Sequence, residues 1–192
     1  MITIIESKNF LESDAQAIVN FVSCSGEAIN FDGEKIFEQN PEMFKKYLGF
    51  CGDGKLKPGM IWYYKGKDKE ILNFAVSKGS DSREIQLEDF KNGLIKLKQI
   101  IENKNINSIA ITNIVQLNDI IDFNALYDDM FYDCPFNVEV YNYKMIHEVS
   151  PQELVQDEYL SQDKTPSKQN DNKSKNSVVT HITYPENTIF HI

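Results

Sequence analysis

The side chains that could act as nucleophiles or metal ligands are few and lie far apart in the sequence. Cys24 follows Ser23, but no histidine lies near them in the chain to act as the base that a serine or thiol nucleophile needs. The cysteines have no CxxC spacing and the histidines no HxH or HxxxH spacing: Cys24, Cys51, Cys134, His147, His181 and His191. We therefore expect reduced thiols, no metal site and no cofactor.

The net charge and the hydropathy pattern exclude further classes of protein. The net charge of −9 argues against a phosphate-neutralising surface, and no basic patch stands out, so direct binding to a nucleic-acid backbone is not expected. No apolar run approaches the roughly 20 residues of a membrane span, so no membrane association is expected. Residues 1–6 alternate like a strand and lack the features of a secretory signal, which favours a cytoplasmic location.

The elements that must position any site alternate between strands and helices. Strand patterns occupy residues 2–6, 17–22, 60–64, 70–75, 108–111 and 137–141. Helical spacing occupies residues 33–48, with a break at Pro41, and residues 87–103 and 124–130. The aromatic cluster Trp62-Tyr63-Tyr64 is expected to pack in the sheet rather than to stack nucleobases. This order predicts an α/β fold with a mixed, largely parallel sheet covered on both faces.

The composition changes after about residue 148. Residues 1–148 form the predicted domain, and residues 149–177 are expected to be a disordered linker because they offer too few apolar side chains for a core. Residues 178–192 regain a strand-like apolar pattern. They are either an exposed tail or a peptide that adds a strand to a partner or to the chain's own sheet.

Several segments, taken in order, resemble macro domains. Residues 1–6 and 11–20 are similar to the opening of such domains. The similarity continues through Asn40-Pro41-Glu42-Met43-Phe44, Lys57-Pro58-Gly59, Leu72-Asn73-Phe74, Leu87-Glu88-Asp89, Gly93-Leu94 and Ser108-Ile109-Ala110-Ile111. The likeness covers most of residues 1–145, and it is to the DarG type, antitoxins that remove ADP-ribose from DNA. It implies a three-layer α/β/α macro-domain fold around the predicted sheet.

The resemblance also implies which residues would hold ADP-ribose. Asn9 matches the residue that reads adenine, and Ser23 matches an asparagine that positions the ribose or takes part in catalysis. The bordering loops and strand ends supply the other implied ligand-binding residues: Cys24, Gly26, Asn113, Phe123 and Tyr141. Tyr141 and Tyr143 lie where an aromatic ring stacks on the distal ribose. Lys78 lies about one residue from a lysine that DarG-like hydrolases place at the anomeric carbon.

The two loops that hold the diphosphate in such domains are glycine-rich, and here they are not. Only Gly26 remains near the start of the first loop, and residues 112–123 contain no glycine. Backbone N–H groups converge on a diphosphate where no Cβ intervenes, and branched residues disfavour the positive φ that this requires. We therefore expect the second loop to run differently and its apolar residues to fill the cleft: Ile114, Val115 and Ile120.

These observations lead to competing hypotheses. The first is an inactive module that binds a protein or an ADP-ribose-derived nucleotide, in toxin–antitoxin or phage-defence biology; Glu27 and Asp32 would repel a diphosphate by about 1 kcal/mol per close pair even in water. The alternative is an ADP-ribosyl glycohydrolase that uses Lys78, with Asn9 and Ser23 positioning the ligand. A nucleophilic lysine needs a lowered pKa, and without one Lys78 is a solvated surface residue. In a third hypothesis the C-terminal segment is the working part.

Overall fold

The computed structural model describes residues 1–6, 9–79, 81, 84–143, 145–146 and 181–182, arranged in two compact units, Met1–Tyr143 and Lys144–Ile192. The predicted linker at residues 149–177 and most of the apolar segment at 178–192 lie outside the described residues. In the second unit, β7 (Met145–Ile146) pairs antiparallel with β8 (His181–Ile182). No helix among the described residues is long and apolar enough to cross a membrane.

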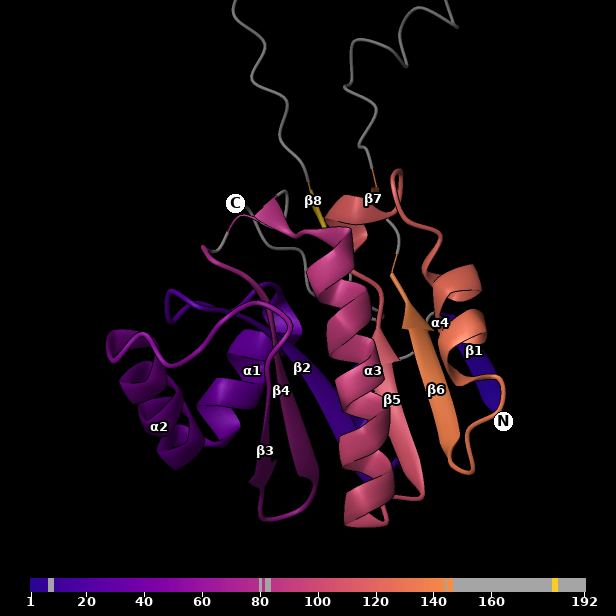
Figure 1. Cartoon of the computed structure of the whole chain (residues 1–192), viewed down its shortest axis with the longest axis horizontal. Coiled ribbons are helices and arrows are strands. Elements are labelled where there is room, and N and C mark those ends of the chain that lie inside the picture. Colours follow the sequence, from indigo (N-terminus) through magenta and orange to yellow (C-terminus); the bar gives the residue numbers. More distant parts are fainter. Residues whose placement is uncertain (7–8, 80, 82–83, 144, 147–180, 183–192) are drawn as a thin grey trace, which may run out of the picture. The chain divides into compact units, whose positions relative to one another are not determined.

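A six-stranded sheet forms the centre of the first unit (Figure 1). Its strands are β1 (Ile2–Glu6), β2 (Ala17–Ser23), β3 (Ile61–Lys65), β4 (Glu70–Ser77), β5 (Ser108–Thr112) and β6 (Asn137–Asn142). Their spatial order is β1-β6-β5-β2-β4-β3, and every neighbouring pair is parallel except β3 with β4. The predicted α/β class and the mixed, largely parallel sheet are therefore confirmed.

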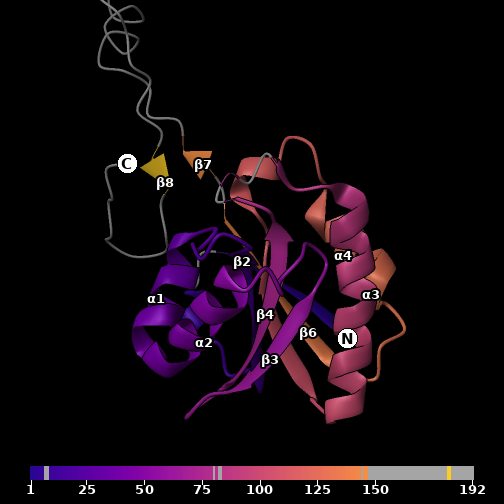
Figure 2. The same cartoon turned by 60° about the vertical axis from the view of Figure 1, so that its left-hand side comes forward.

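Helices cover both faces of this sheet, which gives the three predicted layers (Figure 2). Helices α1 (Phe31–Gln39) and α2 (Pro41–Gly52) lie on one face, and Pro41 begins α2 at the predicted break. Helices α3 (Leu87–Lys104) and α4 (Phe123–Phe131) lie on the other. Two short 3₁₀ helices, η1 (Phe10–Glu12) and η3 (Val115–Leu117), have too few residues for an apolar period to define them in the sequence.

The central strands are buried on both faces, as parallel strands between helical layers must be. All seven residues of β2 are buried. Phe21 and Phe74, on neighbouring strands, pack against Phe90 of α3, with the rings of Phe74 and Phe90 stacked 5.2 Å apart. This aromatic cluster anchors α3 on the sheet.

Gly93 lets α3 approach β4 closely. A Cβ at this position would lie 2.2 Å from Cζ of Phe74, a ring that is itself fully buried and held by Phe90. The exposed Gly49 of α2 has no atom within 4 Å of an added Cβ. The two glycines therefore differ in packing, although both lie within helices.

Gly93→Ala is expected to lower the free energy of unfolding by about 2 kcal/mol, because a Cβ only 2.2 Å from a buried ring should cost close to the upper end of the overpacking range of about 1–3 kcal/mol, against a helix-propensity gain of about 1 kcal/mol. Urea denaturation measures the change. The matched variant Gly49→Ala gains propensity without a clash and should raise stability by about 0.5–1 kcal/mol. A Gly93→Ala protein as stable as the parent would contradict this packing.

Candidate functional site

The carboxyl ends of the parallel strands lie at the same end of the sheet, and ligands of open α/β sheets bind there. Ser23 ends β2 and Ser77 ends β4, and the two are partners in the register with no exposed surface. The Cys24 N–H donates to the Ser77 carbonyl at 2.9 Å. Lys78 follows Ser77 and is exposed. The fold thus brings the predicted residues Ser23, Cys24 and Lys78 to the carboxyl ends of two neighbouring strands, β2 and β4.

The Ser23 hydroxyl organises the first loop. Its Oγ accepts the N–H groups of Ser25 at 3.2 Å and Glu27 at 3.1 Å, and it donates to the Glu27 carbonyl at 2.8 Å. The Ser23 N–H donates to the same carbonyl at 3.2 Å. With Cys24 bound to Ser77, the N–H groups of Ser23, Cys24, Ser25 and Glu27 are all engaged inside the chain.

Gly26 makes this compact loop possible. Its φ of +98° lies in the region that favours glycine, and an added Cβ would lie 3.0 Å from the Leu48 side chain. The predicted loop glycine is therefore required for the loop to fold back upon Ser23.

Tyr47 closes the loop from the side of α2. Its ring is fully buried, and its hydroxyl lies 2.7 Å from the Ser23 carbonyl and 3.0 Å from the Glu27 carbonyl, to which it donates. Burial raises the pKa of Tyr47, so this hydroxyl remains a donor. The sequence pattern placed Tyr47 on the apolar face of a helix, and periodicity carries no information about the partner of a hydroxyl.

Cys24 does not have the properties of a nucleophile. Burial, with a smaller effect from Cys51, raises the pKa of the Cys24 thiol to about 11. The thiol therefore stays protonated at neutral pH, and the thiolate is the reactive species. Cys24, Cys51 and Cys134 are all unpaired.

The second loop is held by its own backbone and by Asn113. The Asn113 amide donates to the Asn118 side chain at 2.7 Å and to the Tyr143 carbonyl at 2.8 Å, and it accepts the Tyr143 N–H at 2.8 Å. Four N–H groups of the loop, those of Leu117, Asn118, Ile120 and Ile121, donate to carbonyls of Ile114, Val115 and Leu117. Asn113 therefore joins this loop to the end of β6.

Apolar side chains of the second loop extend the core. Ile114, Val115 and Leu117 are buried, and the buried Phe123 meets the ring of Phe90 edge to face at 6.0 Å. Burial of Ile114 and Val115 agrees with the expected apolar loop. Ile120 differs, since 78% of it is exposed.

Asn9 and Tyr141 both lie next to Phe10, Asn9 in the chain and Tyr141 through a ring contact. The side-chain Oδ1 of Asn9 accepts the Leu11 N–H at 3.0 Å, which caps η1, and the side-chain amide of Asn9 donates to the Glu12 carboxylate at 3.1 Å. Phe10 packs edge to face with Tyr141 at 5.7 Å, and the Tyr141 hydroxyl donates to Glu139 at 3.0 Å. Tyr141 is buried. Both predicted residues thus have established partners within the fold.

Asp32 is a buried carboxyl group in the first turn of α1, which sequence reasoning had noted only for its charge. It is 3% exposed, and its Oδ2 atom has no hydrogen-bond partner among the described residues. Burial raises its pKa to about 6, and a hydrogen bond with the Tyr143 side chain opposes part of this rise. The Tyr143 hydroxyl also accepts the Phe10 N–H at 3.2 Å.

No three histidine, cysteine, aspartate or glutamate side chains gather in the described ranges as a metal site would require. The histidines at positions 147 and 191 lie outside those ranges.

Solved structures with the same fold were found by comparison. The macrodomain of Mycobacterium tuberculosis DarG has a TM-score of 0.65 and 27% identity, with 73% of this chain and 97% of that chain covered. The macrodomain of Thermus aquaticus DarG has a TM-score of 0.64 and 21% identity over the same shares. Thermosipho africanus DarTG, solved in complex with ADP-ribose, has a TM-score of 0.63 and 15% identity, with 73% of this chain and 41% of that chain covered. The sequence matches no protein-family model and no curated protein.

Asp32→Asn is expected to change how stability depends on pH. A carboxyl whose pKa is raised from 3.8 to about 6 on folding destabilises the fold progressively as pH rises through that window, by on the order of 2–3 kcal/mol above it. Urea denaturation of the variant between pH 4 and 7 should lack this loss of stability. Glu34→Gln removes an exposed acid in the same helical turn and so controls for the lost charge. This variant should still lose stability as the pH rises from 4 to 7. An unchanged profile in Asp32→Asn would contradict this assignment.

Proposed function

We propose, from the macrodomain fold of this chain, that it acts by binding a protein or an ADP-ribose-derived nucleotide and has no ADP-ribosyl hydrolase activity. A fold does not by itself carry an activity, so the proposal depends on the site. A role in neutralising a toxin or in phage defence follows by analogy with DarG. The unpaired cysteines are in keeping with action in the reducing cytoplasm.

The hydrogen bonds of the first loop carry this proposal. A loop that binds a diphosphate must offer free backbone N–H groups to its oxygens. Here the N–H groups of Cys24, Ser25 and Glu27 already have acceptors inside the chain. The acceptor for Ser25 and Glu27 is the hydroxyl of Ser23, a residue that is fully buried. Releasing them would expose unsatisfied groups at a cost of about 1–3 kcal/mol each.

The second loop supports the same proposal. Its buried side chains Ile114 and Leu117 belong to the hydrophobic core, so the loop cannot rearrange without exposing apolar surface. Its Leu117, Asn118 and Ile120 N–H groups are also paired. Both loops are thus stabilised by interactions that compete with a nucleotide diphosphate.

The chain is expected to give no binding heat with ADP-ribose at millimolar concentration in isothermal titration calorimetry, because N–H groups of both loops already donate to acceptors inside the chain. The Thermosipho africanus protein, whose structure holds ADP-ribose, serves as the positive control. Micromolar binding by this chain would contradict the proposal and favour the hydrolase.

The alternative function is an ADP-ribosyl glycohydrolase centred on Lys78. The observation that favours it is position: Lys78 is exposed immediately after β4, beside the Ser77 that pairs with Ser23. In that case Asn9 and Ser23 would orient the ligand. Both would first have to leave their present hydrogen bonds, since the Asn9 side chain caps η1 and the Ser23 hydroxyl holds the first loop.

Purified chain is expected to release no ADP-ribose from ADP-ribosylated DNA or protein, and Lys78→Ala should be indistinguishable from it. Lys91→Ala, at an exposed lysine of α3, is the matched control. Release by the parent chain that Lys78→Ala abolishes and Lys91→Ala preserves would establish the hydrolase instead. Chromatography of the released ADP-ribose provides the measurement.

A further inference from the structure

Two of the three cysteines lie in the region where α2 packs against the first loop. Cys24 directly follows β2, and Cys51 lies in the last turn of α2. Both residues are partly exposed, and both thiols are unpaired. The proposed function uses neither thiol, and two neighbouring thiols have a chemistry of their own.

Helix α2 contacts the first loop over successive turns. The Tyr47 hydroxyl donates to the Glu27 carbonyl at 3.0 Å. A Cβ added to Gly26 would lie 3.0 Å from the Leu48 side chain. Cys51 lies four residues after Tyr47, and residues at this spacing share one side of a helix. The sequence of α2 therefore directs Cys51 to the same side as the contacts with the loop.

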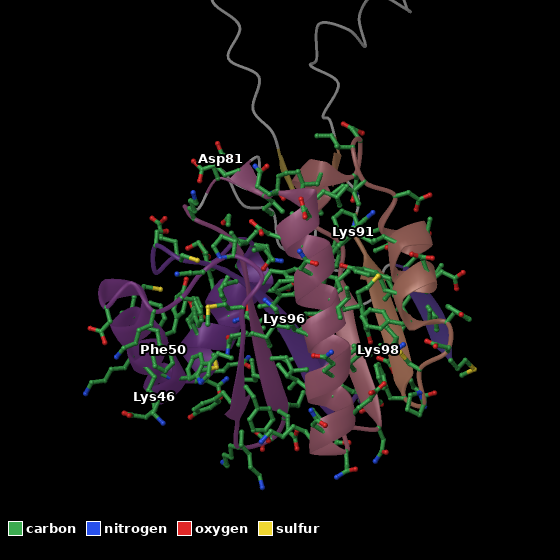
Figure 3. All side chains as sticks on the ribbon, viewed as in Figure 1. Lys46, Phe50, Asp81, Lys91, Lys96 and Lys98 are labelled. Atoms are coloured by element: carbon green, nitrogen blue, oxygen red, sulfur yellow. The ribbon has the colours of Figure 1, made fainter. Side chains whose placement is uncertain are left out.

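The contacts of the Cys51 thiol lie at the loop rather than at β3. Burial raises the pKa of Cys51, and hydrogen bonds with the Tyr47 side chain and the Gly26 backbone oppose part of this rise. Figure 3 shows Phe50, the preceding residue, on α2, and its ring instead meets the tryptophan of β3 edge to face at 5.0 Å. The Cys51 thiol therefore contacts the loop two residues after Cys24.

The compact loop keeps Cys24 close to this contact. The Ser25 and Glu27 N–H groups both fold back upon the Ser23 hydroxyl, and two residues of chain span at most about 7 Å. Cys51 also contributes to the raised pKa of the Cys24 thiol, an electrostatic effect that falls with distance. A disulfide needs Cα atoms about 4.4–6.8 Å apart, a separation that this arrangement allows.

We propose that Cys24 and Cys51 are a modification site, at which a low-molecular-weight disulfide oxidises the two thiols to a disulfide that locks the first loop on α2. The Cys51 thiolate attacks one sulfur of the small disulfide, which forms a mixed disulfide and releases one small thiol. The Cys24 thiolate then attacks the Cys51 sulfur and releases the second small thiol. The protein loses two electrons and two protons, and the small disulfide gains them.

The environment of the two thiols makes this bond slow to form and stable once formed. The thiolate is the attacking species, and a pKa of about 11 leaves little of Cys24 in that form at neutral pH. A thiol of high pKa is also a poor leaving group, and the reduced pair gains no stability from a thiolate. The site therefore responds to sustained rather than to brief oxidation.

This inference goes beyond the proposed function, because it concerns the covalent state of the first loop and not what the loop binds. The calorimetric test with ADP-ribose uses the reduced chain, so either result of that test leaves the disulfide proposal unaffected. The converse also holds, since failure of the disulfide to form leaves the hydrogen bonds of the reduced loop unchanged.

Mass spectrometry tests whether the bond forms. Full chain incubated with oxidised glutathione at about pH 8.5 is expected to lose two hydrogens, about 2 Da per molecule. Lys35, Lys45 and Lys46 lie between the two cysteines, so trypsin separates the segments that carry them. Peptides 9–35 and 47–55 should be joined before reduction and separate after it.

Variants of the cysteines identify the pair. Cys51→Ser should abolish the bond within the molecule. Cys134→Ser should form the bond as readily as the parent chain, because Cys134 follows α4, which covers the other face of the sheet. Urea denaturation of each reduced variant checks that the fold is retained.

Hydrogen exchange tests whether the bond locks the loop. The Ser25 and Glu27 N–H groups should exchange about tenfold or more slowly in the oxidised than in the reduced chain, because a disulfide opposes local opening. In Cys51→Ser the exchange of these two groups should not depend on treatment with oxidised glutathione.

Three results would overturn the proposal. The first is that peptides 9–35 and 47–55 are not joined after oxidation. The second is a bond that joins two molecules or that Cys134→Ser removes. The third is equal exchange of the Ser25 and Glu27 N–H groups in the oxidised and reduced chains.

Discussion

The Ser23 hydroxyl holds the first loop in place by accepting two backbone N–H groups while donating to a carbonyl of the same loop. A serine oxygen has one proton and two acceptor sites, so this small group is saturated. Tyr47 adds a second clamp from α2. The polar groups at the end of β2 are thereby satisfied by the protein itself, and they need no ligand to be stable when buried.

The second loop reaches the same end by a different route. It has no glycine, and its apolar side chains join the core under α3 and α4 through Phe123. The Asn113 side chain then ties the loop to Tyr143, the residue that follows β6, through two hydrogen bonds and to Asn118 through a third. In both loops, backbone N–H groups donate to acceptors within the chain.

Periodicity predicted most of the fold, and it could not predict the site. The helix at Leu87–Lys104 and the buried strand at Ala17–Ser23 follow from apolar spacing alone, because that spacing reflects which face is buried. The partners of Ser23, Tyr47 and Asn113 are set by contacts between distant segments, which no local pattern encodes.

The pairing of β1 has a consequence for the order of folding. Among the described residues, β1 has β6 as its one neighbour in the sheet, and the amino group of Met1 donates to the carbonyl of Phe136, 135 positions later in the chain. Pairs of such long separation must wait for extensive loop closure, and in synthesis for the emergence of β6 from the ribosome. β2, β3 and β4 can associate much earlier, so β1 is among the last strands to be ordered although it precedes them in the chain.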